Sequence, residues 1–150
     1  MSDRDRIQQR RFMGAADEAV VSLLVAAVHL KQAADTVVER HGITGDQYNV
    51  LRILRGVHPG GHPRCEVARR MIHPSPDVTR MLDRLVRRGL VARVQDPADR
   101  RLSVATITKA GLTLLERIDP ELESVQQAAT AVLTPAQLRQ LARLCDALVP

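Results

Sequence analysis

Hydrophobic positions nearly encircle the first long segment of the chain. Residues 15–41 contain neither proline nor glycine, and their apolar side chains fall on most sides of a helix: Val20, Val21, Leu23, Leu24, Val25, Val28 and Leu30. A helix that is apolar on most sides must be covered on most sides. In a chain of 150 residues, we expect a second subunit to provide much of that cover.

Capping signals predict where the next helix begins. Thr44 and Gln47 have the spacing of a capping box, in which each side chain satisfies a backbone N–H of the other residue. The helix that follows is expected to continue to Arg55 and to stop at Gly56, before a loop rich in glycine and proline at 58–63.

Two further helices are predicted on either side of a tight turn. The first covers 64–71, and the second covers 76–88, with Ser75 as N-cap, Pro76 in the first turn and Gly89 at its end. The apolar positions of the second helix share one face: Val78, Met81, Leu82, Leu85 and Val86. The opposite face is polar: Thr79, Arg80, Asp83, Arg84 and Arg87.

A β-hairpin follows. Residues 90–94 and 102–107 have strand composition, and the segment between them begins with Asp96 and Pro97, which favour a turn. Two short helices, a tight turn and a hairpin together predict a winged helix-turn-helix.

The remainder of the chain is predicted to be helical. Thr108 caps a long helix to about Thr130, in which Pro120 is expected to cause a kink or a break. A second capping box, Thr134 and Gln137, opens an amphipathic last helix. The expected fold class is therefore mainly α with a small β-hairpin wing and dimerisation helices at both ends.

Composition narrows the functional classes. Apolar residues make up 45% of the chain and aromatic residues 1%, which predicts an aliphatic core and excludes base stacking on an aromatic platform. The start of the chain lacks a signal peptide, and the most apolar run, 19–30, is shorter than the roughly 20 residues of a membrane span. We therefore expect a cytoplasmic protein without a membrane partner.

The excess positive charge is concentrated in one segment. Residues 64–101 contain ten arginines and five acidic residues, which accounts for the whole formal charge of +5. Such a concentration is typical of nucleic-acid binding, although a solvated basic face also produces it. The B-DNA major groove admits one helix. We therefore expect DNA to be contacted by the helix at 76–88, by the residues at its start and by the wing. The predicted contact residues are Ser75, Asp77, Thr79, Arg80, Arg84, Arg87, Asp99, Arg100 and Arg101.

Four segments resemble the MarR regulators of bacteria and archaea. They are ITGDQYNVL at 43–51, DVTRMLDRLVRRGLV at 77–91, DPADRR at 96–101 and ITKAG at 107–111. The resemblance implies a homodimer, most often a repressor, whose two winged lobes bind a pseudo-palindromic double-stranded operator. It also implies that Asp99 orients Arg100 or Arg101 toward the minor groove. The expected domain plan is a single domain, 1–150, with dimerisation helices at 15–41 and 109–150 and a DNA-binding lobe at 43–108.

The resemblance further implies release from DNA by a small phenolic or carboxylate effector. His29, His41, Tyr48 and Arg52 fall near the position at which the family binds such molecules. Each residue could equally have a structural role, and His29 fits a core or interface histidine. The alternative function is a winged-helix module that acts without an effector, or mainly through protein contacts.

Other chemistries receive little support from the sequence. The spacing of His58, His62, Cys65 and His73 matches no zinc motif, so solvated loop histidines are expected and no metal site. Cys145 lies on an apolar helix face, and redox sensing by either cysteine is not favoured. No phosphate-binding loop or hydrolase motif is present, and we expect neither catalytic residues nor a cofactor.

Overall fold

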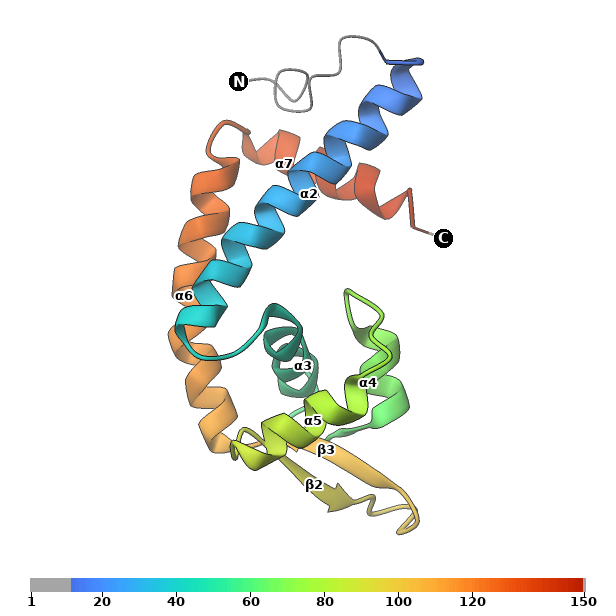
Figure 1. Cartoon of the computed structure of the whole chain (residues 1–150), viewed down its shortest axis with the longest axis vertical. Helices are drawn as coiled ribbons and strands as arrows, with labels where there is room; N and C mark the ends of the chain where they lie inside the picture. Colours follow the sequence, from blue (N-terminus) through green and yellow to red (C-terminus); the bar gives the residue numbers. More distant parts are fainter. Residues whose placement is uncertain (1–11, 150) are drawn as a thin grey trace. The chain divides into compact units, whose positions relative to one another are not determined.

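The computed structural model describes residues 12–149, and it is mainly helical with a small antiparallel sheet (Figure 1). This architecture confirms the predicted fold class. The elements follow in the order α2 (Ala15–Arg40), α3 (Gly45–Arg55), β1 (His62–Pro63), α4 (Arg64–Arg70), α5 (Val78–Arg87), β2 (Val91–Gln95), β3 (Ser103–Ile107), α6 (Lys109–Thr130) and α7 (Pro135–Asp146).

The described residues form two compact units. We call residues 12–34 with 124–149 the helical unit, and Asp35–Glu123 the winged unit. The winged unit contains the expected lobe, 43–108, together with the end of α2 and the first part of α6.

The hydrophobic core lies in the winged unit. Every buried apolar residue among those described falls between Val37 and Leu122, and all are aliphatic, as the composition predicts. Leu51, Leu54, Leu82, Leu85, Leu115 and Ile118 are the largest of the fully buried side chains. Helices α3, α4 and α5 and the sheet therefore hold one another in fixed positions.

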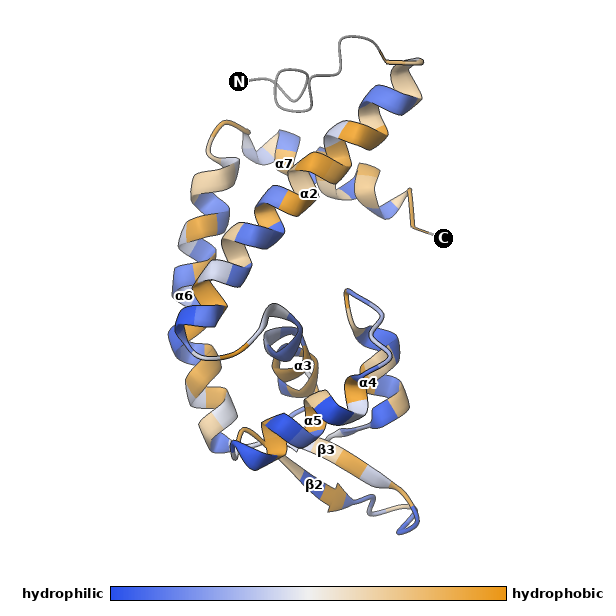
Figure 2. Cartoon of the chain, in the orientation of Figure 1, coloured by the Kyte–Doolittle hydropathy of each residue, from blue (hydrophilic) through white to orange (hydrophobic). Residues whose placement is uncertain are grey.

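The helical unit instead exposes its large apolar side chains. On α2 these are Val20, Leu23, Leu24, Val28 and Leu30, and on and after α7 they are Leu138, Leu141, Leu144, Leu148 and Val149. Figure 2 shows the apolar stretch of α2 in orange. No residue of the helical unit is buried among the residues described.

Helix α2 is longer than the apolar run that it contains. With 26 residues it is long and apolar enough, by length and composition alone, to cross a membrane, so the length argument against a span is wrong. One such helix near the N-terminus is weak evidence for a span. An apolar helix that packs against a second subunit has the same composition.

The sheet contains one strand that the sequence pattern did not predict. β1 pairs with β3, with His62 opposite Ala105, so the strand order is β1-β3-β2 rather than a simple hairpin. Gly61 permits this approach, because a Cβ atom there would lie 2.3 Å from the carbonyl oxygen of Ala105. The 58–63 loop prediction was therefore wrong at its last two residues.

The start of α5 and the continuity of α6 also differ from the prediction. Helix α5 begins at Val78 with Asp77 as its N-cap, two residues later than expected, and the Ser75 hydroxyl instead accepts the N–H of Asp77 at 3.3 Å. Pro120 lies inside α6 without ending that helix. Both predicted capping boxes are present, at Thr44 and at Thr134.

The end of α5 has the hydrogen bonds of a Schellman motif. The N–H of Gly89 donates to Val86 O at 2.9 Å, and that of Leu90 donates to Leu85 O at 3.0 Å. Gly89 adopts φ 71°, a left-handed conformation that glycine accepts without steric cost. This turn leads the chain directly from α5 into β2.

Candidate nucleic-acid interface

Helix α5 separates its apolar and basic side chains on opposite faces. Val78, Leu82 and Leu85 are buried in the winged unit, whereas the side chains on the opposite face are exposed: Thr79, Arg80, Arg84 and Arg87. Burial of the apolar face fixes the rotation of the helix about its axis. The exposed arginines therefore point away from the core along one stripe.

The turn that precedes α5 is anchored by the side-chain amide of a residue in α3. Asn49 Oδ1 accepts the backbone N–H of Ile72 at 2.9 Å. Arg80 forms an ion pair with Asp77 at 3.5 Å, three residues earlier on the same helix. Ser75, Asp77 and Arg80 are thus linked to one another at the start of α5, and their contact with DNA stays a prediction.

Asp83 has a different partner from the one expected. Its carboxylate accepts a hydrogen bond from Arg93 of β2 at 2.5 Å, and not from Arg87 at the next helical turn. The bond joins α5 to the wing and leaves Arg87 without an acidic partner among the described residues. Sequence spacing alone favoured the local pair, because the packing of α5 against β2 is not visible in the sequence.

The wing tip is ordered by two aspartates that accept backbone hydrogen bonds. Asp96 Oδ1 accepts the N–H groups of Ala98 and Asp99 at 2.7 and 3.1 Å, and Asp99 Oδ1 accepts that of Arg101 at 3.0 Å. Asp99 contacts neither Arg100 nor Arg101 through their side chains. The expected carboxylate–guanidinium contact is therefore absent from the described structure, and Asp99 acts on the backbone of the tip.

The exposed cations of α5 and the wing are not neutralised. Arg84, Arg87, Arg100 and Arg101 are exposed and form no ion pair with any described residue. On α4, by contrast, Glu66 pairs with Arg69 at 2.8 Å and with Arg70 at 3.3 Å. The hydrogen bond from Arg69 is the main cause of the lowered pKa of Glu66. Within the DNA-binding segment, α5 and the wing tip therefore carry uncompensated positive charge, whereas Arg69 and Arg70 of α4 are compensated by Glu66.

Of the four expected effector residues, Tyr48 and Arg52 lie together. The Arg52 guanidinium carbon is 5.9 Å from the centre of the Tyr48 ring, within the range of a cation–π contact. The Tyr48 hydroxyl donates to Asp119 Oδ1 of α6 at 2.7 Å, and Arg55 donates to Asp119 Oδ2 at 2.5 Å. Arg55 and Asp119 were missed because 64 and 71 residues separate Asp119 from its two partners.

The other two expected effector residues, His41 and His29, have different contacts from Tyr48 and Arg52. His41 Nε2 lies 2.8 Å from Glu121 Oε1, and Arg40 donates to the other oxygen of Glu121 at 3.0 Å. His41 and Tyr48 thus engage carboxylates two residues apart on α6. His29 is exposed on α2 and belongs to the helical unit, and its role in an effector site stays a prediction.

The Tyr48–Asp119 contact changes the acidity of both groups. Burial, and then the hydrogen bond to Asp119, raise the pKa of Tyr48 from 10.0 to about 12. Burial opposes ionisation of Asp119, but the hydrogen bonds from Arg55 and Tyr48 outweigh it and lower the pKa of that carboxyl. The phenol is therefore neutral and Asp119 is ionised at neutral pH.

Titration of tyrosinate absorbance measures this contact directly, because Tyr48 is the only tyrosine and tryptophan is absent. We expect Tyr48 to remain protonated at about pH 11, one unit above the usual range. Since the folded pKa is raised, the contact contributes stability below pH 10 that is lost as the pH approaches 12. In Asp119→Asn the midpoint should fall toward 10.0. Equal midpoints in the two proteins would contradict the contact.

The cysteine and histidine residues form no metal site in the part of the chain that is described. No group of three His, Cys, Asp or Glu side chains lies close enough to hold an ion within residues 12–149. Cys65 is exposed and Cys145 is half-exposed, and both are free thiols.

Comparisons with known proteins point to one family. A model of the MarR family matches residues 41–102, which include α3, the helix-turn-helix, β2 and the wing tip but not β3. The chain is 29% identical over 129 residues to the homoprotocatechuate degradative operon repressor of Escherichia coli, covering 83% of this chain and 86% of the relative.

Solved structures of MarR proteins have a similar fold over most of the length of this chain. A MarR transcription factor from Planctomyces limnophilus is 33% identical, with a TM-score of 0.69 and coverage of 91% of this chain and 98% of that one. BpsR of Bordetella bronchiseptica, whose DNA binding is regulated by 6-hydroxynicotinic acid, is 27% identical with a TM-score of 0.74; 84% of this chain and 89% of that chain are covered.

Proposed function

Because the chain belongs to the MarR family of winged helix-turn-helix, DNA-binding transcription regulators, we propose that it is a dimeric repressor of a pseudo-palindromic operator. The family regulates transcription and is not a family of enzymes. The observation that carries the proposal is the unneutralised charge of Arg84 and Arg87 on α5 and of Arg100 and Arg101 on the wing. A cytoplasmic location agrees with this function.

The two basic elements suit different parts of one half-site. Helix α5 enters the major groove with Thr79 and Arg80 near its start, where base edges are within reach, and Arg84 and Arg87 follow toward the phosphates. The wing tip carries its arginines to the narrow minor groove, whose potential attracts guanidinium groups. The Asp83–Arg93 ion pair fixes the wing relative to α5, so that both elements contact DNA together.

The effector that causes the protein to release its operator is, in this proposal, a small aromatic acid. The regulation of BpsR by 6-hydroxynicotinic acid and the repressor function of the E. coli relative support this part of the proposal. Tyr48 and Arg52 offer an aromatic face and a cation for such a molecule, with His41 as a further polar group. The effector must bind the conformation that does not fit DNA more tightly, because equal affinity for both conformations shifts nothing.

Competition binding tests the proposal against the alternative of a module that works mainly through protein contacts. A labelled duplex from the DNA flanking the gene, chosen for a pseudo-palindrome, is titrated with protein and then with unlabelled competitors. We expect the same duplex to compete at least about a thousandfold better than a shuffled one. Equal competition by the shuffled duplex would contradict a sequence-specific regulator, and insensitivity to aromatic acids would contradict only the effector.

The salt dependence of binding should identify the phosphate contacts. Log K is expected to fall linearly with log[salt], with a slope of about −0.9 per phosphate neutralised. Arg84→Ala or Arg87→Ala should flatten that slope by about two, because a dimer loses one contact in each half-site. Arg139→Ala, which removes an exposed charge from α7, serves as the matched control. A residue whose substitution leaves the slope unchanged does not contact phosphate.

A further inference from the structure

Large apolar side chains are exposed at only three places in the winged unit, and all three belong to the helix-turn-helix or the wing. Among residues 35–123, all of which the structure describes, they are Ile72 before α5, and Val94 and Leu102 in the wing. Ile72 is the most exposed of them, at 74%. The large apolar side chains that this unit leaves exposed thus lie on the same elements as the proposed DNA contacts.

The backbone around Ile72 is held by α3. Its N–H donates to Oδ1 of Asn49 at 2.9 Å, and the next residue, His73, lies 3.6 Å from the carboxylate of Asp46. Pro74 follows, and its ring fixes φ. The isoleucine side chain is itself stiff, because it is branched at Cβ. A contact made by Ile72 therefore has a small cost in conformational entropy.

Ile72 points away from the core, toward the surface that begins α5. The preceding residue, Met71, is buried, whereas Ile72 is exposed. In a helix-turn-helix, the turn leads into the helix whose first residues reach base edges in the major groove. Thr79 and Arg80 are in the first turn of that helix here. The turn that carries Ile72 therefore approaches the groove together with these two residues.

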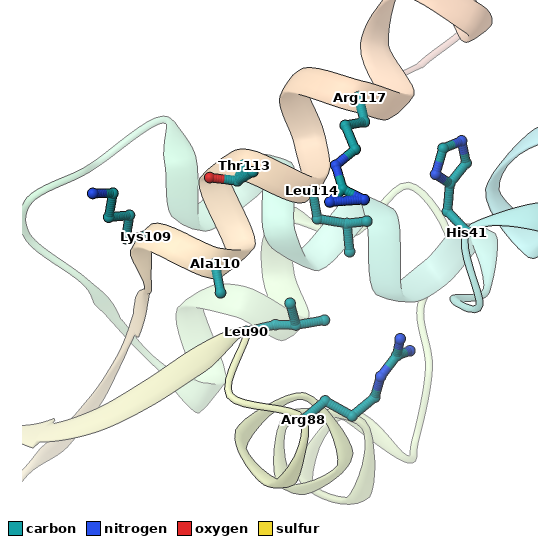
Figure 3. A pocket seen from close by; sticks show the side chains of 8 residues that line it. All are labelled: His41, Arg88, Leu90, Lys109, Ala110, Thr113, Leu114 and Arg117. Atoms are coloured by element: carbon teal, nitrogen blue, oxygen red, sulfur yellow. The ribbon is translucent and has the colours of Figure 1, made fainter.

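The pocket of the winged unit does not account for the exposure of Ile72. That pocket has a volume of about 600 Å³ and is lined by Arg88, Leu90 and Arg117 among others (Figure 3). Arg88 directly follows the last residue of α5, whereas Ile72 precedes the first. Neither Ile72 nor any residue predicted to contact DNA lines the pocket. A ligand in that pocket would therefore leave Ile72 uncovered.

We propose that Ile72 packs against a thymine methyl group in each half-site of the operator and so specifies a T·A base pair there. An isoleucine side chain has no polar atom, so it contributes nothing to phosphate binding or to base hydrogen bonds. The C5 methyl group of thymine is an apolar feature of the major groove that no other base carries. The contact rests on the proposed function and adds an apolar determinant to the charged contacts of α5 and the wing.

Deoxyuridine tests this contact, because it lacks the C5 methyl group of thymidine and still pairs with adenine. Each thymine of the pseudo-palindromic duplex is replaced in turn, with the equivalent change in the other half-site, and the affinity of the full-length protein is measured. At one position the replacement should weaken binding by about fifteenfold. This is roughly fourfold for each of the two methyl groups withdrawn from an apolar contact.

Ile72→Ala separates a side-chain contact from an effect of the methyl group on DNA shape. An effect on shape persists in the variant, whereas a contact with Ile72 is lost. Ile72→Ala should therefore bind the thymine and deoxyuridine duplexes with nearly equal affinity at that position. Ile72→Val keeps most of the apolar side chain and should retain most of the discrimination. Leu102→Ala is the matched control, because it removes an exposed apolar side chain from the wing, and it should discriminate as wild type does.

The possible failures of this proposal and of the proposed function are distinct. A deoxyuridine effect of the same size in wild type and in Ile72→Ala would overturn the thymine contact, as would the absence of any such effect. Specific binding of the pseudo-palindrome would then still support a regulator. Equal competition by the shuffled duplex would instead overturn the regulator and the thymine contact together.

Discussion

Leu144→Asp is expected to convert the protein from a dimer to monomers and to lower operator affinity by at least about a hundredfold. Leu144 is 58% exposed in the single chain, on the same helix as Leu138 and Leu141. A substitution at so exposed a site changes the stability of a monomer by roughly 0.5 kcal/mol or less. A charge placed in the centre of a dimer interface is instead desolvated without a partner. Loss of the dimer separates the two winged lobes, and with them the gain from binding two half-sites at once.

Sedimentation at micromolar concentration measures the first effect, and titration of the pseudo-palindromic duplex measures the second. Leu144→Met is the matched control, because it keeps an apolar side chain of similar volume and should remain a dimer. Arg84→Ala should weaken DNA binding without changing the sedimentation of the protein. A Leu144→Asp variant that stays dimeric would show that α7 lies outside the interface.

The second large effect is expected at the wing. Arg100→Ala or Arg101→Ala should each weaken specific binding by about 1–3 kcal/mol, roughly fivefold to 150-fold, the usual result of losing one specific contact. Both side chains are exposed and have no acidic partner among the described residues, so the loss reflects DNA and not the fold. Competition with shuffled duplex separates a specific contact from a general electrostatic one.

Asp99 allows the shape of the wing tip to be tested apart from its charge. Its carboxylate accepts the backbone N–H of Arg101, and the amide oxygen of Asp99→Asn can accept the same hydrogen bond. Asp99→Asn should therefore bind DNA at least as tightly as wild type, because one negative charge is removed. Asp99→Ala should bind more weakly although it removes the same charge. Tighter binding by Asp99→Ala would mean that the turn does not position the wing arginines.

Local signals in the sequence predicted the features that depend on neighbouring residues. The capping boxes at Thr44 and Thr134 and the stop at Gly89 were predicted correctly, since each rests on hydrogen bonds within a few residues. The basic face of α5 follows from helical periodicity alone. The wing was also located correctly, because its two strands and the turn between them are contiguous in the sequence.

Contacts between distant segments could not be predicted in the same way. β1 has only two residues, which is too few for an alternating pattern, and it pairs with a strand about forty residues later. The partner of Asp83 is on β2 and that of Tyr48 is on α6. The lining of the pocket in the winged unit likewise comes from distant segments, because Arg88 follows α5 and Arg117 lies on α6.

Because buried apolar residues occur in only one of the two units, the winged unit and the helical unit should unfold in different ways. The winged unit contains every buried apolar side chain among the residues described, so its unfolding should not depend on protein concentration. In the proposed dimer the helical unit gains its cover from association, and its apparent Tm should therefore rise with protein concentration by mass action. Two calorimetric transitions should then move relative to one another as the protein is concentrated. At low copy number, the concentration at which two helical units associate would then set the abundance at which the proposed regulator begins to bind its operator.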